Sequence, residues 1–284
     1  MDDLEVAAAA ARAGAAVVAG GFGTGIVPEM KSRFDPVTVI DRASEAAVLA
    51  VLTEHRPDDG VLGEEGTDTH GSGRRWLIDP LDGTVNFVHR IDHVSVSVAL
   101  CEGERVLVGV VLDVTRGELF AAAAGEGATL GGVPIAVSDT PDLAGSVVAT
   151  GFPYDHDRYA ASYMPGLGAV LAQVTGLRRF GSAALDLCWT AAGRFDGYFE
   201  YQLKPWDLAA GLLIVTEAGG IATDPWGTTL GPYMPHVVVA NQAIHEPLRR
   251  LVEPNVPAHL GSRPVTGSEV EHSGATHAEE SLER

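Results

Sequence analysis

The chain has 284 residues, of which 46% are hydrophobic and 20% charged, so it is long enough to bury a full core without disulfide bridges. Its 38 acidic and 19 basic residues give a net charge of −19, which disfavours nucleic acid as a macromolecular partner. The two cysteines, Cys101 and Cys188, exclude a disulfide scaffold and fit a reducing compartment, so we expect a cytoplasmic protein.

The first predicted element is a helix over residues 4–19, which is rich in alanine and ends at a pair of glycines. The chain opens with acids rather than with the basic segment of a signal peptide, and no apolar run approaches the roughly 18–20 residues of a membrane-spanning helix. We therefore expect no membrane partner. The glycine-rich segment 20–25 resembles a dinucleotide-binding loop only superficially, because it follows a helix and its glycine spacing is wrong.

Strands dominate the next part of the chain. VTVI (37–40) is a predicted strand, a helix is expected from Asp41, and VLGEEG (61–66) is a short strand that runs into two glutamates. A polar, glycine-rich loop that could move follows at 66–75. From 93 to 137, apolar segments with period two alternate with glycine-rich turns, which predicts an antiparallel meander.

The second half mixes helices and strands. We predict strands at 146–152, 196–200 and 236–241, helices at 182–193 and 206–220, and a closing segment at 244–252. This mixture predicts an α/β fold of mixed sheets layered with helices, in one domain over 1–254. The residues after Pro254 are polar and acidic, so 255–284 is expected to be a largely disordered tail.

Six acidic residues stand at the ends of apolar segments, and most have a simple structural explanation. They are Asp41, Glu64, Glu65, Asp79, Asp82 and Asp207. Asp41 and Asp207 occupy positions typical of helix N-caps, the two glutamates fit a solvated loop, and Asp82 fits a turn. Asp79 is the hardest to explain in this way, because it closes an apolar strand with no basic residue near it in the sequence.

Taken together, these acids predict a metal site. Several segments end in carboxylates where an open sheet exposes the carboxyl ends of its strands, which is the usual place for a site. Like charges about 4 Å apart cost about 4 kcal/mol at an effective dielectric constant of about 20, so converging carboxylates need a cation. Mg²⁺ fits this need, because it binds through a few carboxylates together with water and substrate phosphate.

The spacing of Asp79 and Asp82 argues against one competing class. Haloacid-dehalogenase-like phosphatases end a strand in Asp-x-Asp-x-Thr, with the nucleophile and the acid separated by a single residue. In the sequence DPLDGT the two aspartates are separated by Pro80 and Leu81. The aspartyl-phosphate mechanism of that class is therefore not expected.

At this point the sequence resembles the inositol monophosphatases, a lithium-sensitive, magnesium-dependent superfamily of phosphatases. The blocks that carry the resemblance are GEEG (63–66), WLIDPLDGTVNFVH (76–89) and KPWDLAAGLLIVTEAGG (204–220). Further agreement comes from MKSRFDPVTVIDRASE (30–45), FGSAALDLCWTAAGRFDGYFE (180–200) and HVVVAN (236–241). The resemblance runs in order from about residue 5 to residue 252, and together the blocks are very specific.

The resemblance implies a five-layer αβαβα sandwich, a homodimer, and hydrolysis of small phosphomonoesters with two or three Mg²⁺ ions. Carried over by motif, Glu64, Asp79 and the carbonyl of Leu81 resemble the ligands of a first metal ion. Asp79, Asp82 and Asp207 resemble the ligands of a second, so that Asp79 would bridge the pair.

The resemblance also implies roles in catalysis. Metal ions would neutralise the phosphate and lower the pKa of the attacking water, which Thr84, paired with Asp41, would orient or deprotonate with help from Glu64. The backbone N–H groups of Gly83 and Thr84 would bind phosphate at a helix start. The expected mechanism is in-line attack by water, with no covalent intermediate.

Four further residues are expected to contact the alcohol part of the substrate. Gly181, Ser182 and Ala183 match the family's loop that faces the ring hydroxyls. Glu200 matches a glutamate that accepts hydrogen bonds from inositol, although a surface acid at a strand end is the simpler explanation. Lys204 departs from some members and receives no role.

The expected function is therefore Mg²⁺-dependent hydrolysis of a small phosphorylated polyol or sugar, above all myo-inositol 1-phosphate. The same chemistry on histidinol phosphate, fructose 1,6-bisphosphate or a phosphoadenosine-type nucleotide is the alternative. A non-catalytic, acidic metal-binding or regulatory protein on a phosphatase fold is the alternative from another class.

Overall fold

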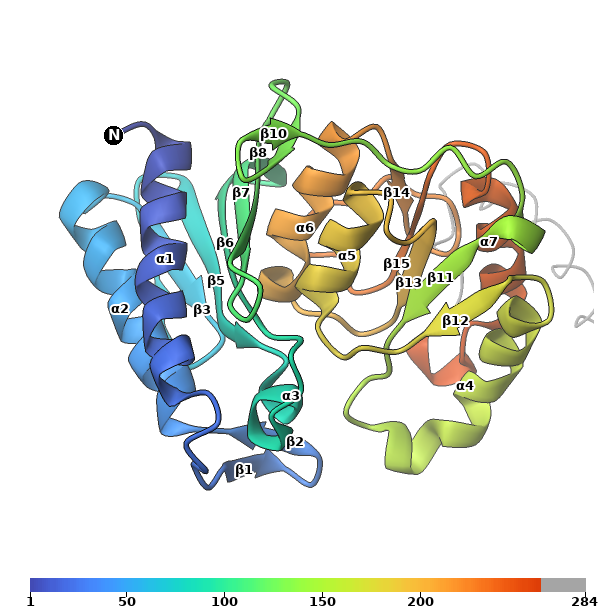
Figure 1. Cartoon of the computed structure of the whole chain (residues 1–284), viewed down its shortest axis with the longest axis horizontal. Helices are drawn as coiled ribbons and strands as arrows, with labels where there is room; N and C mark the ends of the chain where they lie inside the picture. The colour runs from blue at the N-terminus through green and yellow to red at the C-terminus, as the bar shows by residue number, and fades with distance from the viewer. Residues whose placement is uncertain (262–284) are drawn as a thin grey trace, which may run out of the picture.

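The computed structural model describes residues 1–261, whose helices and strands are arranged in five layers (Figure 1). The α-helices are α1 (Asp3–Gly21), α2 (Val39–His55), α3 (Thr84–His89), α4 (His156–Leu171), α5 (Ala183–Ala191), α6 (Pro205–Glu217) and α7 (His245–Val252). Short 3₁₀ turns occur at Leu143–Gly145, Glu253–Asn255 and Ala258–Leu260.

The strands form two large sheets and one hairpin. The eight-stranded sheet has the order β10 (Val133–Pro134), β9 (Ala128–Leu130), β8 (Glu118–Ala123), β7 (Arg105–Asp113), β6 (Ser95–Glu102), β5 (Arg74–Asp82), β3 (Gly60–Gly63), β4 (Asp68–Thr69). The five-stranded sheet has the order β12 (Gly176–Arg178), β11 (Val147–Thr150), β13 (Gly197–Glu200), β15 (Val237–Ala240), β14 (Ile221–Thr223). The hairpin pairs β1 (Glu29–Ser32) with β2 (Asp35–Val37).

The layers follow the order α, β, α, β, α, as the resemblance implies. Trp76 and Ile78 on β5 join the apolar cluster under α1 and α2, whereas Leu77 between them joins the cluster of α5 and α6. This alternation is the period of a strand that is buried on both faces. Helices α5 and α6 lie between the two sheets, and α4 and α7 cover the far face of the five-stranded sheet (Figure 1).

Helix α1 differs from the sequence expectation. By length and composition alone it could cross a membrane, so the statement that no apolar run is long enough was wrong. In the structure one face of the helix packs on protein: Val6, Ala10 and Val18 are fully buried in the cluster shared with α2 and the eight-stranded sheet. An added Cβ at Gly14 would lie 2.8 Å from Val48, which shows how closely α1 approaches α2. Its apolar character is that of a core helix.

Strand β5 carries a β-bulge where it reaches the two aspartates of the motif. Asp79 lies opposite Ser97 and Asp82 opposite Ser95, so three steps along β5 match two along β6. Side chains three positions apart on a regular strand point to opposite faces, and the extra residue of a bulge cancels that alternation. Both carboxylates therefore reach the same side of the sheet.

Two other local expectations change. The predicted strand 37–40 is only the end of β2, because Thr38 is the N-cap of α2 and accepts a hydrogen bond from the Ile40 N–H. The predicted loop 66–75 contains β4 and the start of β5.

The described chain also continues past the predicted domain end at 254. Val256 and Leu260 pack on the apolar cluster of α4 and α7. Residues 255–261 thus belong with the fold, whereas the rest of the predicted tail, 262–284, lies outside the described residues.

Candidate active site

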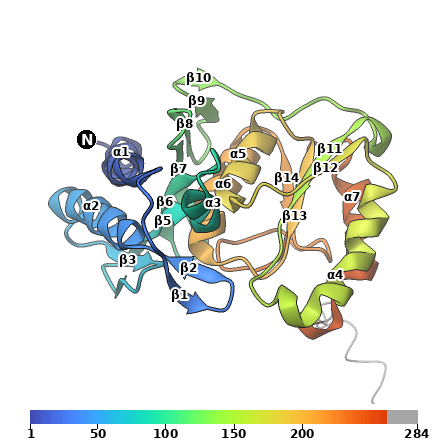
Figure 2. The same cartoon turned by 60° about the horizontal axis from the view of Figure 1, so that its bottom comes forward.

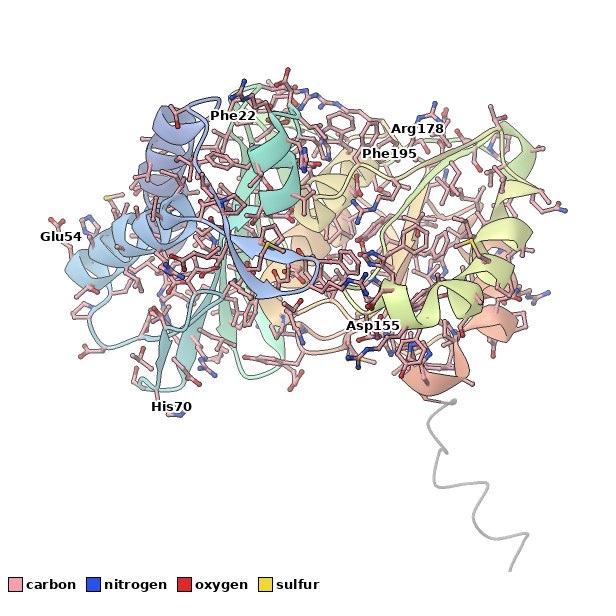
Figure 3. The ribbon with its side chains drawn as sticks, turned by 90° about the horizontal axis from the view of Figure 1, so that it is seen from below. Phe22, Glu54, His70, Asp155, Arg178 and Phe195 are labelled. Carbon is pink, nitrogen blue, oxygen red and sulfur yellow. The ribbon has the colours of Figure 1, made fainter. Side chains whose placement is uncertain are left out.

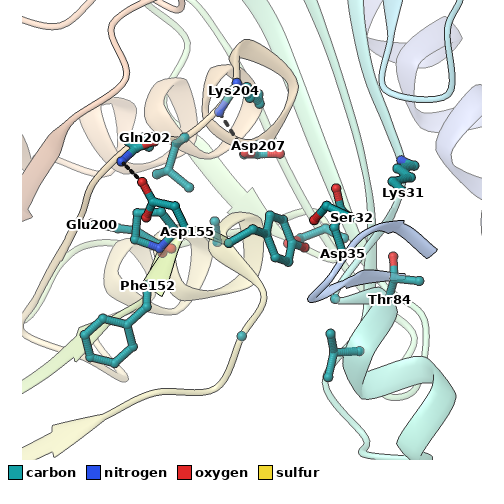
Figure 4. A pocket seen from close by; sticks show the side chains of 18 of the residues that line it. Lys31, Ser32, Asp35, Thr84, Phe152, Asp155, Glu200, Gln202, Lys204 and Asp207 are labelled. Atoms are coloured by element: carbon teal, nitrogen blue, oxygen red, sulfur yellow. Dashed lines mark hydrogen bonds between the residues drawn. The ribbon is translucent and has the colours of Figure 1, made fainter. Parts of the chain in front are cut away.

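A cavity of about 600 Å³ is lined by the end of β5, the β1–β2 hairpin, the starts of α4 and α5, and the segment between β13 and α6 (Figure 4). The hairpin and the start of α4 lie along the same edge of the molecule (Figure 2). They touch there: Arg33 pairs with Asp157 at 3.2 Å, and the rings of Phe34 and His156 stack with 4.8 Å between their centroids. Segments far apart in the sequence thus enclose one space.

Most residues predicted for the site line this cavity. They are Glu64, Asp79, Leu81, Asp82, Gly83, Thr84, Gly181, Ala183, Glu200 and Asp207. Asp41 and Ser182 are not among the lining residues; both are buried, and their side chains bind Thr84 and Asp82. Ser182, which was expected to face the substrate, therefore supports a carboxylate instead.

Asp79 is a buried carboxylate surrounded by other acids. Its Oδ1 accepts a hydrogen bond from the Leu81 N–H at 3.0 Å, across the bulge. Burial raises the pKa of Asp79 well above its usual value, and the neighbouring charges of Glu64, Asp82 and Asp207 raise it further. The chain alone thus disfavours the ionised form of this side chain.

Asp82 has many more hydrogen-bond donors. Its Oδ2 accepts from the Ser182 hydroxyl at 2.5 Å, from the Ala184 N–H at 2.9 Å and from the Ser95 hydroxyl at 3.3 Å. Burial raises the pKa of Asp82, and these donors oppose the rise. Ser182 is also the N-cap of α5, so the start of that helix fixes the carboxylate.

Asp207 and Glu64 complete the acidic wall. Asp207, in the first turn of α6, accepts at Oδ2 from the Lys204 N–H at 2.8 Å, and burial followed by the charge of Glu64 raises its pKa well above normal. Glu64 accepts from Lys31 of the hairpin at 3.0 Å. Burial raises the pKa of Glu64 to about 7, although Lys31 opposes the shift. Asp207 was expected at a helix N-cap. It lies instead in the first turn of α6, but its carboxylate accepts from the N–H of the N-cap residue Lys204, so that expectation is confirmed in part.

Thr84 and Asp41 form the pair that the resemblance implies. The Thr84 hydroxyl lies 3.0 Å from Asp41 Oδ1 and 3.1 Å from the Leu81 carbonyl oxygen, and either oxygen can accept its hydrogen bond. Asp41 Oδ2 accepts from the Thr38 N–H at 2.8 Å and from the Thr38 hydroxyl at 2.6 Å, in the capping box of α2. Asp41 is therefore not the N-cap itself but completes the capping box of α2, and it is also a partner of the cavity-lining threonine.

The carboxylate oxygens of this cavity are suitable ligands for a hard divalent cation. The hydrogen bonds of Asp79, Asp82 and Asp207 engage one carboxylate oxygen of each. Burial raises the pKa of all three, and repulsion by neighbouring acids adds to the rise for Asp79 and Asp207. A cation with oxygen ligands would remove that repulsion. Within residues 1–261, no three His, Cys, Asp or Glu side chains form a preformed metal-binding cluster. The fit therefore rests on the chemistry of the donors.

Glu200 ends β13 at the other side of the cavity. It accepts a hydrogen bond from the Tyr198 hydroxyl at 2.5 Å, and burial raises its pKa to about 7. An added Cβ at Gly151 would lie 2.0 Å from this carboxylate, so only glycine leaves room for it. Glu200 is thus a buried acid and not the surface acid of the simpler explanation.

Sequence reasoning missed several residues of the site. Lys31, Tyr154 and Arg179 line the cavity, and Asn86 donates to the carbonyls of His93 and Phe180, each at 2.8 Å, beside the Gly181 loop. Asn86 lies inside the motif block 76–89, which was a signal that it could be functional. Lys31 likewise lies inside the block 30–45, whereas Tyr154 and Arg179 stand outside the quoted blocks, and only the fold brings these two to the site.

The five-layer fold with an acid-lined cavity at the end of β5 is the arrangement expected for the class of phosphatases that the sequence resembles. The chain matches the model of the inositol monophosphatase family over residues 2–256. It is 42% identical to the Nus factor SuhB of Pasteurella multocida over 255 residues, which cover 88% of this chain and 96% of that protein. The chain belongs to the inositol monophosphatase family.

Solved structures agree with this assignment. The extragenic suppressor protein suhB of Bartonella henselae matches with a TM-score of 0.83 and 36% identity, over 88% of this chain and 97% of that one. An inositol monophosphatase from Anabaena (Nostoc) sp. PCC 7120 matches with a TM-score of 0.79 and 36% identity, over 90% and 97%. Membership of the family supports phosphatase activity on a phosphomonoester, and the family is typically metal-dependent.

Proposed function

We propose that the protein hydrolyses a small phosphorylated polyol or sugar, with myo-inositol 1-phosphate as the first candidate substrate. One observation carries this proposal: four acids from three separate segments line one cavity, and burial raises the pKa of each. The charges of the other acids raise the pKa of Asp79 and Asp207 further. Two or three Mg²⁺ ions held by Glu64, Asp79, the Leu81 carbonyl, Asp82 and Asp207 would neutralise phosphate oxygens and the leaving alkoxide.

Thr84 and Asp41 are proposed to position the attacking water. The Thr84 hydroxyl donates its hydrogen bond to Asp41 or to the Leu81 carbonyl. The lone pairs of the Thr84 oxygen therefore remain free to accept a hydrogen bond from a water in the cavity. The bond from a water proton to Thr84 would leave the oxygen of that water directed at phosphorus. In-line attack then requires no covalent link between protein and phosphate.

The opposite wall is proposed to recognise the alcohol. Glu200 can accept hydrogen bonds from ring hydroxyls when ionised, and Arg179 and Tyr154 offer donors to the same space. Glycine at 181 has φ +85, a conformation that favours glycine, so the backbone of that loop can approach a substrate closely.

The proposed partner is a small phosphorylated molecule, and the proposed assembly is a homodimer. Several relatives bear the name Nus factor SuhB, so a role of that kind is a separate candidate. The net charge of −19 argues against direct binding of nucleic acid phosphates by this chain.

A substrate panel tests the proposal. The full chain with saturating Mg²⁺ would receive myo-inositol 1-phosphate, histidinol phosphate, fructose 1,6-bisphosphate and a phosphoadenosine phosphate, with phosphate release as the measurement. We expect the highest kcat/KM for the inositol ester and no turnover after chelation. A preference of more than about tenfold for another ester would change the substrate, and no release from any would refute the phosphatase.

A further inference from the structure

The segment between Glu200 and Asp207 joins the two walls of the cavity, and its centre is strained. Gln202 has φ +60, a left-handed conformation that costs energy for a residue with a side chain. Such a conformation persists only when neighbouring groups hold it. Three hydrogen bonds do so here: the Gln202 N–H donates to His236 Nδ1 at 3.2 Å, and its amide donates to Asp155 Oδ2 at 3.0 Å and to the Tyr163 hydroxyl at 3.3 Å.

The C-terminal turn Ala258–Leu260 contacts the groups that hold Gln202. The Tyr163 hydroxyl donates to Asp155 Oδ1 at 2.9 Å, so it accepts from His259 Nε2, which lies 3.2 Å away. The His259 ring also stacks on Tyr159, with 3.6 Å between centroids and 11° between planes. His259 Nε2 lies 3.8 Å from Asp155 Oδ2, so a protonated ring would pair with that carboxylate.

A second contact leads to the same residue. The backbone of Leu260 lies beside the ring of His236, whose Nδ1 accepts the Gln202 N–H at 3.2 Å. The next amide, that of Leu203, donates to the Pro235 carbonyl at 2.9 Å. Figure 4 shows Gln202 bonded to Asp155 and, close by along the same segment, Lys204 bonded to Asp207.

We propose that the turn Ala258–Leu260 is a positioning element of the active site, in which His259 and Leu260 hold the segment that places Glu200 and Asp207. The proposal rests on the proposed function, because the turn would position residues of that active site although it lies outside the family motifs. Asp155, at the start of α4 (Figure 3), and Gln202 both line the cavity. A substitution of His259 would therefore displace the substrate wall through the side chains of Asp155 and Gln202. It would displace the acidic wall through the backbone that runs from Gln202 to Asp207.

The experiment compares His259→Ala with His259→Gln, which keeps a donor for Tyr163, and with His70→Ala, a matched change at an exposed loop histidine. The readouts are KM and kcat for the best ester of the panel, the Mg²⁺ concentration for half-maximal activity, and amide hydrogen exchange of residues 200–207. For His259→Ala we expect KM and the Mg²⁺ requirement to rise together by about fivefold, the equivalent of one neutral hydrogen bond. Exchange at Gln202 and Leu203 should become faster, and His259→Gln should restore most of both.

Other outcomes overturn the inference. If His259→Ala lowers only the melting temperature or kcat, with KM and exchange of 200–207 equal to those of His70→Ala, the turn is merely structural. If His259→Ala does not fold, Tyr163→Phe removes the hydroxyl that accepts from His259 Nε2, and wild-type KM and exchange of 200–207 in that folded variant refute the inference. If the wild type hydrolyses no ester, the proposed function fails, while the exchange measurement still decides whether the turn holds the segment.

Discussion

The two walls of the cavity are built in different ways. The acidic wall takes Asp79, Asp82 and Thr84 from one short stretch at the end of β5, where a single bulge turns both aspartates inward. The opposite wall takes Glu200 from β13, Asp155 from the start of α4 and its support from the C-terminal turn. Part of the acidic wall is thus encoded locally, although Glu64 and Asp207 reach it from other segments, whereas the groups proposed to recognise the alcohol are all assembled by the fold.

The largest effect is expected from Asp79→Asn, which changes the acidic wall. We expect kcat to fall by at least about a thousandfold, because a metal ion contributes several kcal/mol to charge stabilisation in the transition state. The metal-free variant should melt at a higher temperature than the wild type, since burial and the charges of Glu64, Asp82 and Asp207 disfavour the ionised Asp79. Steady-state phosphate release and thermal melting with and without Mg²⁺ measure both effects.

Asp58→Asn is the matched control, because Asp58 is exposed and lies outside the cavity. It should leave kcat, melting and the stabilisation by Mg²⁺ unchanged. Activity of Asp79→Asn at the wild-type level would show that this wall does not do the chemistry. It would then favour a non-catalytic role for the fold.

A smaller effect is expected from Ser182→Ala. The variant removes the shortest hydrogen bond to Asp82, a charge-assisted bond worth about 2 kcal/mol, so kcat/KM should fall about thirtyfold. Ser95→Ala removes a longer bond, at 3.3 Å, and should cost less. The Mg²⁺ concentration for half-maximal activity separates this role from helix capping, since a lost cap lowers the melting temperature alone. Equal Mg²⁺ requirements in both variants and the wild type would contradict the supporting role.

The acidic wall was predictable from the sequence because its signals are local. Asp79 closes an apolar strand without a basic neighbour, and the blocks around it fix its family. The bulge was not predicted, since it depends on the pairing of β5 with β6, which the spacing of residues within one strand does not contain. Ser182 was placed against the substrate because its motif faces the site, but its position as the N-cap of α5 directs the hydroxyl to Asp82.

The other wall shows where such prediction ends. Glu200 was expected at the site only by resemblance, and its burial follows from Tyr198 and from the missing side chain of Gly151, which is distant in sequence. The mixed sheets layered with helices could be predicted because helical and alternating patterns are strong over most of the chain, whereas the order of five layers was expected only by resemblance. Contacts such as that between His259 and Tyr163 join residues with no shared pattern, so only the packed fold reveals them.

Glu200→Gln tests the second wall through the pH dependence of stability. Burial raises the pKa of Glu200 from its ordinary 4.5 to about 7, so the folded protein favours the protonated form. For such an acid, the contribution to the free energy of unfolding falls as the pH rises from the unfolded pKa through the folded one, by on the order of 3 kcal/mol. Gln keeps an acceptor for the Tyr198 hydroxyl and has no charge to bury.

We therefore expect the variant to gain stability relative to the wild type as the pH rises from about 5 to about 8, measured by chemical denaturation without metal. The difference should be largest at the high end. Parallel pH profiles for the two proteins would show that Glu200 is not held in a buried environment. KM for the inositol ester should also rise in the variant, because a neutral amide accepts weaker hydrogen bonds than a carboxylate.

The smallest effect is expected from a chain that stops after Gly261. His259 makes the contacts of the C-terminal turn with Tyr159, Tyr163 and Asp155, and the backbone of Leu260 lies beside His236, so this truncation keeps all of these residues. Its KM, kcat and Mg²⁺ requirement should equal those of the full chain. A chain that stops after Pro254 removes both residues and also Val256, which packs on the cluster of α4 and α7, so it should lose substrate and Mg²⁺ affinity together. If both truncations behaved like the full chain, the second wall would need no support from the C-terminal turn, and the residues before 255 would suffice to hold Glu200 and Asp155 in place.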